Sequence, residues 1–199
     1  MDSKKLEDLR RRYADQSGGD MYDPHFAAVA RGVFNGQKRK WPFAGVPTLI
    51  TAPYRPELNE ATDFGDLDIA LVGVPMDLGV TNRNGSRFGP RAVRYFERIG
   101  PYEHVLKIAP LTQTKVADIG DIALTSRYDL ARCHADIEAY FTRFVGTNVI
   151  PLAVGGDHSI SLPILKALGR DRPVGMIHID AHCDTSGAFE GTKFHHGGP

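Results

Sequence analysis

From Asp68 onward, short apolar runs alternate with segments of helical spacing, and this alternation constrains the fold more than any other feature. The runs with the length and character of buried strands are "DIALVGVP", "TKVADIGDI", "NVIPLAVGG" and "PVGMIHID". Helical spacing is found in "PRAVRYFERI", "YDLARCHADIEAYFTRFV" and "ISLPILKALG". Right-handed crossovers join such strands into one sheet. We therefore predict an α/β fold whose mainly parallel sheet has helices on both faces.

The amino-terminal part of the chain has a different character. "SKKLEDLRRRY" predicts a short charged helix, and the stretch from Gly18 to about Phe64 is rich in glycine, proline and aromatic residues without a sustained period. We therefore predict a lead-in segment over residues 1–65 and an α/β domain over residues 66–199.

Composition excludes several classes of partner. The 199 residues hold 24 Lys and Arg against 24 Asp and Glu, so no excess of positive charge indicates a nucleic acid partner. No stretch approaches the roughly 18 apolar residues of a membrane span, and the charged start lacks a signal peptide's apolar centre. The two cysteines, Cys133 and Cys183, are far apart in the sequence. We therefore predict a cytoplasmic protein with reduced thiols and no membrane or nucleic acid partner.

The segment "HIDAHCDT", residues 178–185, follows the apolar run "PVGMI" with two histidines and two aspartates. In an extended segment Asp180, His182 and Asp184 would project from one side. Such carboxylates and imidazoles suit Mn²⁺, Zn²⁺, Ni²⁺ or Co²⁺. The alternative is a solvated loop. Burying unpaired carboxylates costs several kcal/mol, and no Lys or Arg lies between Arg172 and Lys193 to pair with them, so we favour a metal site.

A second polar motif, "GGDHS", follows the preceding predicted strand. Taken alone it is ambiguous, because two glycines often mark a tight turn and Asp157 or Ser159 could simply cap the next helix. The carboxyl ends of neighbouring parallel strands meet at one edge of a sheet. The two motifs together therefore predict one metal-binding cluster with four ligands, His158, Asp180, His182 and Asp184.

Five motifs in order resemble the ureohydrolases, the family of arginases, agmatinases and related guanidino-compound hydrolases. They are "GVPMDLGVTNRNGSRFGPRAVR", "ADIGD", "GGDHS", "HIDAHCDT" and "FHHGGP", and the resemblance covers about residue 66 to the end. It implies a three-layer α/β/α fold and two divalent metal ions, usually Mn²⁺, with Ni²⁺ or Zn²⁺ as alternatives. It also implies a metal-bridging hydroxide that attacks a guanidinium carbon and releases urea and an amine.

The same resemblance assigns individual roles. His158 and Asp184 match ligands of the first metal, His182 matches a ligand of the second, and Asp180 matches the bridging carboxylate. His196, in "HHGGP", matches a histidine proposed as a proton shuttle. Its own context leaves open a plain loop imidazole beside a Gly-Gly-Pro turn.

The resemblance also bears on substrate and assembly. Arginases carry Asn two positions after the aspartate that matches Asp184, whereas this chain has Ser186, which argues against arginine. The motif forms look more like agmatinases or the guanidinobutyrase and guanidinopropionase branch. The resemblance further implies a homo-oligomer, a trimer or hexamer when full length, with residues 1–65 as a candidate contact segment.

One part of the family pattern has no counterpart in the sequence. The family supplies a further pair of aspartate ligands, and then a Glu facing the guanidinium, well beyond the His-Gly motif. The fold is therefore expected to be incomplete in this chain, and residues 1–199 alone are expected to be inactive. The alternative function is that of a non-catalytic truncated product that binds partners or full-length subunits.

Overall fold

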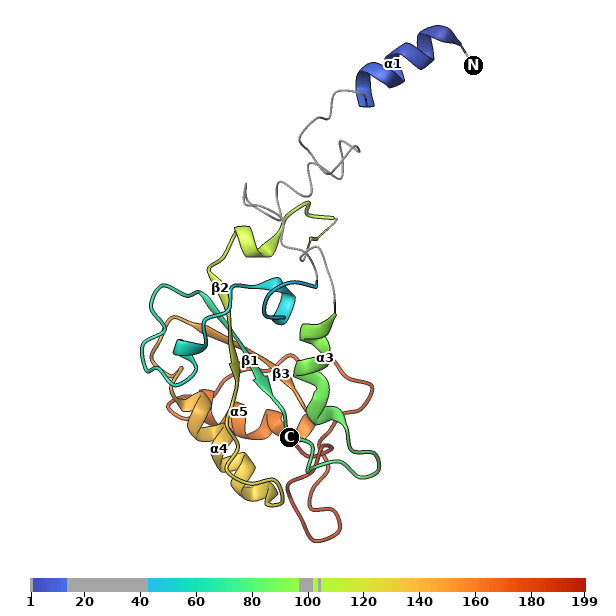
Figure 1. The fold of residues 1–199 in the computed structure, drawn as a ribbon. Coiled ribbons are helices and arrows are strands. Elements are labelled where there is room, and N and C mark those ends of the chain that lie inside the picture. The colour runs from blue at the N-terminus through green and yellow to red at the C-terminus, as the bar shows by residue number, and fades with distance from the viewer. Residues whose placement is uncertain (1, 14–42, 97–101, 104) are drawn as a thin grey trace.

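Three parallel strands form the sheet in the computed structural model, which describes residues 2–13, 43–96, 102–103 and 105–199 (Figure 1). Their order is β2-β1-β3, with Leu71 of β1 opposite Asp118 of β2 and Leu152 of β3. The strand bounds are Ile69–Val74 for β1, Val116–Asp121 for β2 and Ile150–Gly155 for β3. The predicted parallel sheet is therefore confirmed for three of its four runs.

The central strand, β1, is buried on both faces, as its continuous apolar run predicts. Ala70, Val72 and Val74 belong to the larger hydrophobic cluster, whereas Leu71 belongs to a smaller cluster with Leu49. Because side chains alternate along a strand, these two clusters lie on opposite faces of the sheet.

Helices α4 (Leu130–Thr142) and α5 (Ser161–Leu168) pack together and cover the face of the larger cluster (Figure 1). Cys133, Ile137 and Phe141 of α4 point into it, because they lie four residues apart on one side of the helix. The helix begins after Asp129, whose side chain accepts a hydrogen bond from the Arg132 N–H at 3.0 Å. This is the expected role of an aspartate N-cap.

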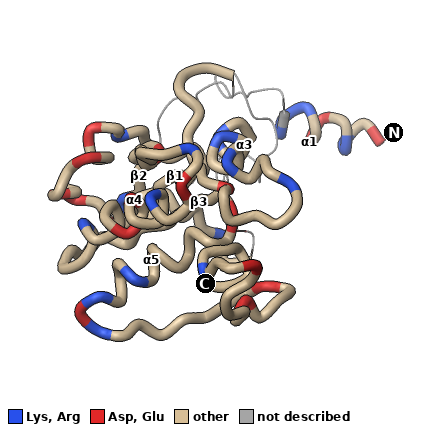
Figure 2. Tube along the Cα trace, turned by 90° about the horizontal axis from the view of Figure 1, so that it is seen from below, with Lys and Arg blue, Asp and Glu red and all other residues tan. Residues whose placement is uncertain are grey.

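The opposite face is covered by α3 (Gly89–Tyr95) and a short 3-10 helix, η1 (Leu49–Thr51). Figure 2 shows basic residues along α3. Arg94 reaches the sheet, where Nε and Nη2 donate to the two carboxylate oxygens of buried Asp118 at 2.8 and 2.9 Å. Burial opposes the charge on Arg94, but the hydrogen bonds to Asp118 outweigh it and raise the pKa of Arg94. The helix predicted over residues 90–99 is confirmed as far as Tyr95. Residues 97–99 lie outside the described residues.

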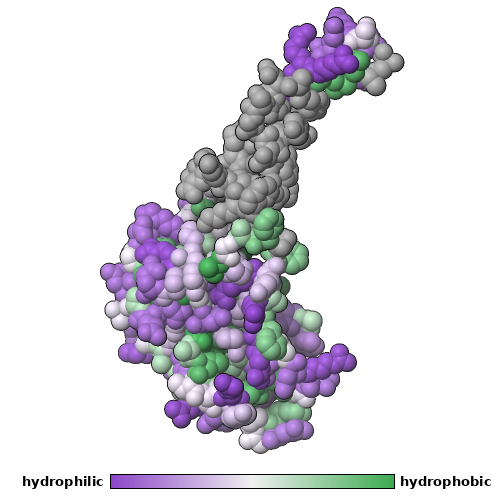
Figure 3. Space-filling model, in the orientation of Figure 1, coloured by the Kyte–Doolittle hydropathy of each residue, from purple (hydrophilic) through white to green (hydrophobic). Residues whose placement is uncertain are grey.

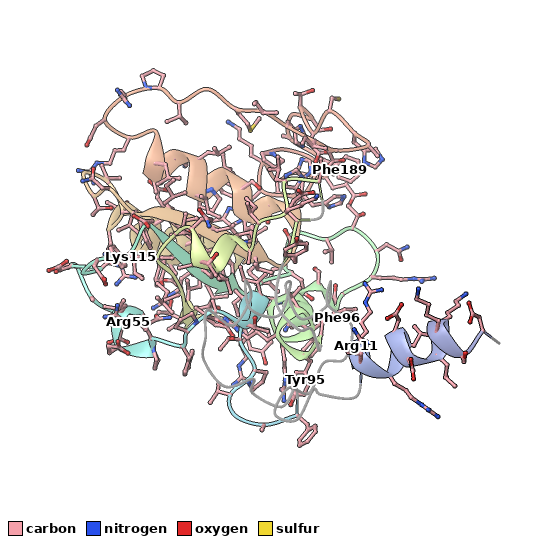
Figure 4. The ribbon with its side chains drawn as sticks, turned by 90° about the horizontal axis from the view of Figure 1, so that it is seen from above. Arg11, Arg55, Tyr95, Phe96, Lys115 and Phe189 are labelled. Atoms are coloured by element: carbon pink, nitrogen blue, oxygen red, sulfur yellow. The ribbon has the colours of Figure 1, made fainter. Side chains whose placement is uncertain are left out.

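Within the lead-in segment, the charged helix is confirmed as α1 (Ser3–Tyr13), and Figure 3 shows its mostly hydrophilic surface. Residues 14–42 lie outside the described part of the chain. Leu58 and Phe64 enter the larger core cluster, so residues before 66 also pack on the sheet. Arg55 and Lys115, on the same side of the molecule in Figure 4, both form ion pairs with Asp66. The other 3-10 helices are η2 (Pro56–Leu58), η3 (Ser86–Phe88), η4 (Pro110–Thr112) and η5 (His158–Ile160).

The prediction of a fourth strand over "PVGMIHID" is wrong for this structure. Residues 173–179 have no regular secondary structure, and the side chains of Ile177 and Ile179 are 92% exposed. A parallel strand is stable when it pairs at a sheet edge and is covered on both faces. Here the described residues provide no such cover for the segment, and Ile150 and Leu152 of β3 also stay exposed.

None of the helices that the structure describes has the length and apolar character needed to cross a membrane.

Candidate metal centre

The candidate site lies where β1 and β3 end side by side at the same edge of the sheet, with Val74 opposite Gly155. The two loops that leave these strands are joined by a hydrogen bond from the Asp157 N–H to the Met76 carbonyl, 2.8 Å. The "GGDHS" motif therefore begins directly at the edge of the sheet, as the strand-end argument predicts.

Gly156 of this motif occupies a position that requires glycine. Its φ is +76°, in the left-handed region, and a Cβ there would lie 2.5 Å from the carbonyl oxygens of Val74 and Met76. The backbone consequently turns tightly against the end of β1 and directs the following residues toward the site.

Both interpretations of "GGDHS" apply in the structure. Asp157 is the N-cap residue of η5, because its Oδ1 accepts a hydrogen bond from the Ser159 N–H at 2.8 Å. The next side chain, His158, turns toward the segment that holds the predicted aspartate ligands, with its Nδ1 2.6 Å from Oδ2 of Asp184. Capping and ligand presentation are therefore compatible roles of neighbouring residues.

Four side chains gather around this contact. The donor atoms of His158, His178, Asp180 and Asp184 all lie within 4.8 Å of one another. Oδ2 of Asp180 is 3.7 Å from both His158 Nδ1 and His178 Nε2. Two carboxylates and two imidazoles at this spacing fit a hard or borderline divalent cation. Three of the four predicted ligands are thus brought together, and His178 joins them.

His182 does not join this group. Its backbone N–H donates to Oδ1 of Asp180 at 2.9 Å, which closes a local turn, and its side chain is 80% exposed. Asp184 then has a φ of +47°. Because the chain bends after Asp180, the extended geometry that would align 180, 182 and 184 is lost. His178 lies two positions before Asp180, so the same two-residue alternation includes it. This spacing was a sequence signal for His178 as a ligand that the prediction did not use.

The electrostatics of the cluster favour an ionised Asp180. The backbone N–H of His182 is the main cause that lowers the pKa of this carboxyl, with smaller contributions from the His182 side chain and from His178 and His158. A carboxylate that stays ionised can bind a cation without first losing a proton.

The two histidines of "FHHGGP" have different surroundings. His195 is buried, with Nε2 3.0 Å from the Gly187 carbonyl and Nδ1 accepting from the Gly197 N–H, so backbone groups satisfy both ring nitrogens. The ring of His195 lies 5.9 Å from that of Phe189, and Figure 4 labels Phe189. His196 instead uses only Nδ1, 3.0 Å from the Gly79 carbonyl. Among the described residues, its Nε2 has no hydrogen-bond partner.

The long loop after β1 is fixed at its base by Asp77, which is fully buried. Oδ2 of Asp77 accepts from the Gly85 N–H at 2.7 Å, and Oδ1 accepts from Nε of Arg87 at 2.5 Å. Burial opposes the charge on Asp77, but the hydrogen bonds of Arg87 and Gly85 outweigh it and lower the pKa of this carboxyl. The "MDLG" and "GSRFG" parts of the motif therefore hold the loop that faces the site.

The parallel sheet has helices on both faces and polar loops at the carboxyl ends of its strands. These features define a three-layer α/β/α protein. The sequence profile of the arginase family matches residues 67–199. The chain belongs to the arginase family.

The chain spans about half the length of the curated relatives it matches. Over 159 residues it is 42% identical to guanidinopropionase of Pseudomonas aeruginosa, covering 79% of this chain and 48% of the relative. It is also 42% identical to a mitochondrial agmatinase of Gallus gallus, covering 78% of this chain and 44% of the relative. The solved structure of proclavaminate amidino hydrolase from Streptomyces clavuligerus superposes with a TM-score of 0.69 and 29% identity, over 80% of this chain and 52% of that one.

Proposed function

We propose that the full-length protein hydrolyses a guanidino compound to urea and an amine in a reaction that depends on divalent metal ions. The observation that carries this proposal is that the donor atoms of His158, Asp180 and Asp184 lie close together. These residues come from two motifs, one directly after β3 and one in an irregular segment about 20 residues later, yet their donor atoms converge. The named activities of the guanidinopropionase and agmatinase relatives support the choice of a guanidino substrate.

His158, Asp180, His182 and Asp184 are the ligands that this function requires of the chain. Three of them already lie together, and His182 Nδ1 is 3.4 Å from Oδ1 of Asp180. Mn²⁺ is the first choice of metal, with Ni²⁺ and Zn²⁺ as alternatives that suit the same oxygen and nitrogen donors. When bound, a pair of such ions lowers the pKa of a shared water and supplies hydroxide near neutral pH.

His196 is the group that moves protons in this proposal. Departure of an amine from a guanidinium needs a proton donor, and an imidazole titrates close enough to neutral pH to donate and to recover a proton from solvent. The hydrogen bond to Gly79 uses Nδ1 and leaves Nε2 for this exchange. His195 has both ring nitrogens engaged by the backbone and serves the turn instead.

The substrate proposed is agmatine or a guanidino acid, and not arginine. Ser186 stands where arginases carry the asparagine that helps hold the amino-acid end of arginine. Its backbone N–H donates to the Gly197 carbonyl at 3.0 Å, which places this position beside the turn that carries His196. The residue that differs from arginases therefore adjoins the proposed proton shuttle.

A urea-release screen tests the proposal. Full-length protein loaded with Mn²⁺ is assayed with agmatine, 4-guanidinobutyrate, 3-guanidinopropionate, guanidine and arginine, and the same preparation treated with a chelator is the control. We expect urea from agmatine or a guanidino acid and none after metal removal. Absence of urea from every compound would refute the function, whereas a preference for arginine would refute the interpretation of Ser186.

A further inference from the structure

Gly79, in the loop after β1, links the "GGDHS" motif to His196. Its N–H donates to Oδ2 of Asp157 at 2.8 Å, in a buried contact. Its carbonyl oxygen accepts from both the backbone N–H and the Nδ1 of His196, each at 3.0 Å. One residue is therefore held on its amide side by a buried carboxylate and holds the imidazole on its carbonyl side.

The direction of these bonds fixes the proton on the imidazole. A carbonyl oxygen only accepts, so the ring of His196 donates from Nδ1 to Gly79, and the neutral ring carries its lone pair on Nε2. His195 has the opposite arrangement, because Nε2 donates to the Gly187 carbonyl while Nδ1 accepts from Gly197. The two adjacent histidines are thus set as opposite tautomers by the backbone groups around them.

The contact between Gly79 and the "GGDHS" motif is close enough to exclude a side chain. A Cβ on Gly79 would lie 2.6 Å from Oγ of Ser159 and 3.0 Å from Oδ1 of Asp157. Ser159 is itself held, because its Oγ is 3.1 Å from Nε2 of buried His134 on α4. The position of the Gly79 carbonyl therefore depends on packing that extends to α4.

We propose that Asp157 is a positioning residue for His196: its carboxylate fixes Gly79, whose carbonyl holds the imidazole as the Nδ1–H tautomer with Nε2 directed to proton exchange. This inference rests on the proposed function for its catalytic consequence. It gives Asp157 a second role beside the capping of η5, and it explains why the loop after β1 places a glycine at this point.

The test measures the tautomer directly in the full-length protein labelled with ¹⁵N-histidine. Ring ¹⁵N shifts distinguish a protonated nitrogen from an unprotonated one, and the His196→Gln variant identifies the signal of His196. We expect the Nδ1–H tautomer for His196 and the Nε2–H tautomer for His195 in the wild type. In Asp157→Asn the His196 signal should move toward a mixture of tautomers, because one amide oxygen cannot replace the two carboxylate oxygens that accept from the N–H groups of Gly79 and Ser159.

Turnover provides the second measurement. Asp157→Asn should lower kcat by about tenfold or more with KM changed by less than about threefold, because a displacement of ~1 Å in a reacting group can cost on the order of 100-fold. The matched control is Asp129→Asn, which makes the same substitution at the N-cap of α4 without touching Gly79 and should alter neither the His196 shifts nor kcat.

The outcomes separate the inference from the function on which it rests. An Nε2–H tautomer for wild-type His196, or unchanged His196 shifts and kcat in folded Asp157→Asn, overturns the positioning role even if the protein releases urea. If Asp157→Asn fails to fold, Gly79→Ala takes its place and must move the same shifts. A protein that releases no urea from any guanidino compound refutes the function, while the tautomer measurement still decides the structural link.

Discussion

The two segments that supply the cluster differ in how the rest of the molecule holds them. The anchored segment, residues 155–160, contains Asp157, Ser159 and Ile160, each at most 7% exposed. The exposed segment, residues 174–184, contains Ile177 and Ile179, each 92% exposed. The anchored segment is fixed by contacts with residues far away in sequence, whereas the exposed segment takes its shape from its own turn. The core therefore holds His158 in place, whereas local geometry determines the positions of His178 and Asp180.

The hydrogen bonds show the same contrast. Asp157 reaches Gly79, 78 positions away in the chain, from a buried position. Asp180 instead accepts from His182, only two positions away and exposed. Long-range buried bonds change only when the fold changes, but a local exposed turn can be replaced at small cost. We therefore expect substitutions in the two segments to have effects of different kinds.

The largest effect is expected at the anchored segment. Gly156→Ala should reduce the free energy of unfolding by about 3 kcal/mol, because the left-handed φ and the clash with two carbonyls each cost roughly 1–3 kcal/mol. Gly187→Ala, outside residues 174–180, is the matched control, since a Cβ there meets nothing within 4 Å. It should change stability by less than about 0.5 kcal/mol. Chemical denaturation of full-length protein checks both, and similar losses at the two glycines would contradict the constraint on Gly156.

A second comparison asks which histidine of the exposed segment binds metal. Ile177 and Ile179 are exposed beside a β3 edge that no described strand occupies. If residues 174–180 add to that edge in the full-length protein, extended chain replaces the turn after Asp180, and His178, Asp180, His182 and Asp184 share one side. His178 then lies within the strand, whereas His182 lies beyond Asp180 at the carboxyl end, next to Asp184. We expect the full-length protein to adopt this arrangement.

Metal retention against a competing chelator measures this choice. His182→Ala should weaken metal retention by more than about tenfold, because losing a group that binds or orients a metal costs at least that much. His178→Ala should leave metal retention nearly unchanged. The reverse result would show that the bent arrangement, with His178 in the cluster, persists in the full-length protein.

The smallest effect concerns the pH dependence of stability near the anchored segment. Burial lowers the pKa of His134, with a smaller opposing effect of Asp157. The unfolded chain then binds a proton more readily than the folded one, so stability is complete above the ordinary value of 6.5 and falls as pH drops below it toward the folded pKa.

His134→Gln removes this titration while keeping a polar group near Ser159. The variant should show a shallower loss of stability below pH 6.5, by at most about 1.4 kcal/mol per pH unit. Thermal unfolding at several pH values between 5 and 8 provides the measurement. Equal slopes in the two proteins would mean that His134 does not carry the effect.

The sequence predicted the parts of the fold whose apolar runs find partners within the described residues. "DIALVGVP" and "NVIPLAVGG" form paired strands because each borders another strand and a helical layer. "PVGMIHID" has a similar apolar character and is not a strand, because pairing and cover depend on neighbours that a local pattern does not reveal. Composition gives the capacity for a strand, and tertiary contacts decide whether it forms.

The site shows the same limit. His158, Asp180 and Asp184 could be predicted because their residue types and strand-end positions carry the signal. The bend that sets His182 aside depends on one hydrogen bond from its own N–H to Asp180, which competes with the extended geometry. The contact of Asp157 with Gly79 joins two loops distant in sequence. Residue spacing in the sequence contains no information about such a long-range contact.

We propose that the anchored and exposed segments together form one metal centre. Elemental analysis of full-length protein saturated with Mn²⁺ tests it most directly, in the wild type and in His158→Ala, which removes the ligand of the anchored segment. We expect two ions per subunit in the wild type and about one in the variant, with urea release largely lost. Two retained ions together with full urea release in His158→Ala would contradict it.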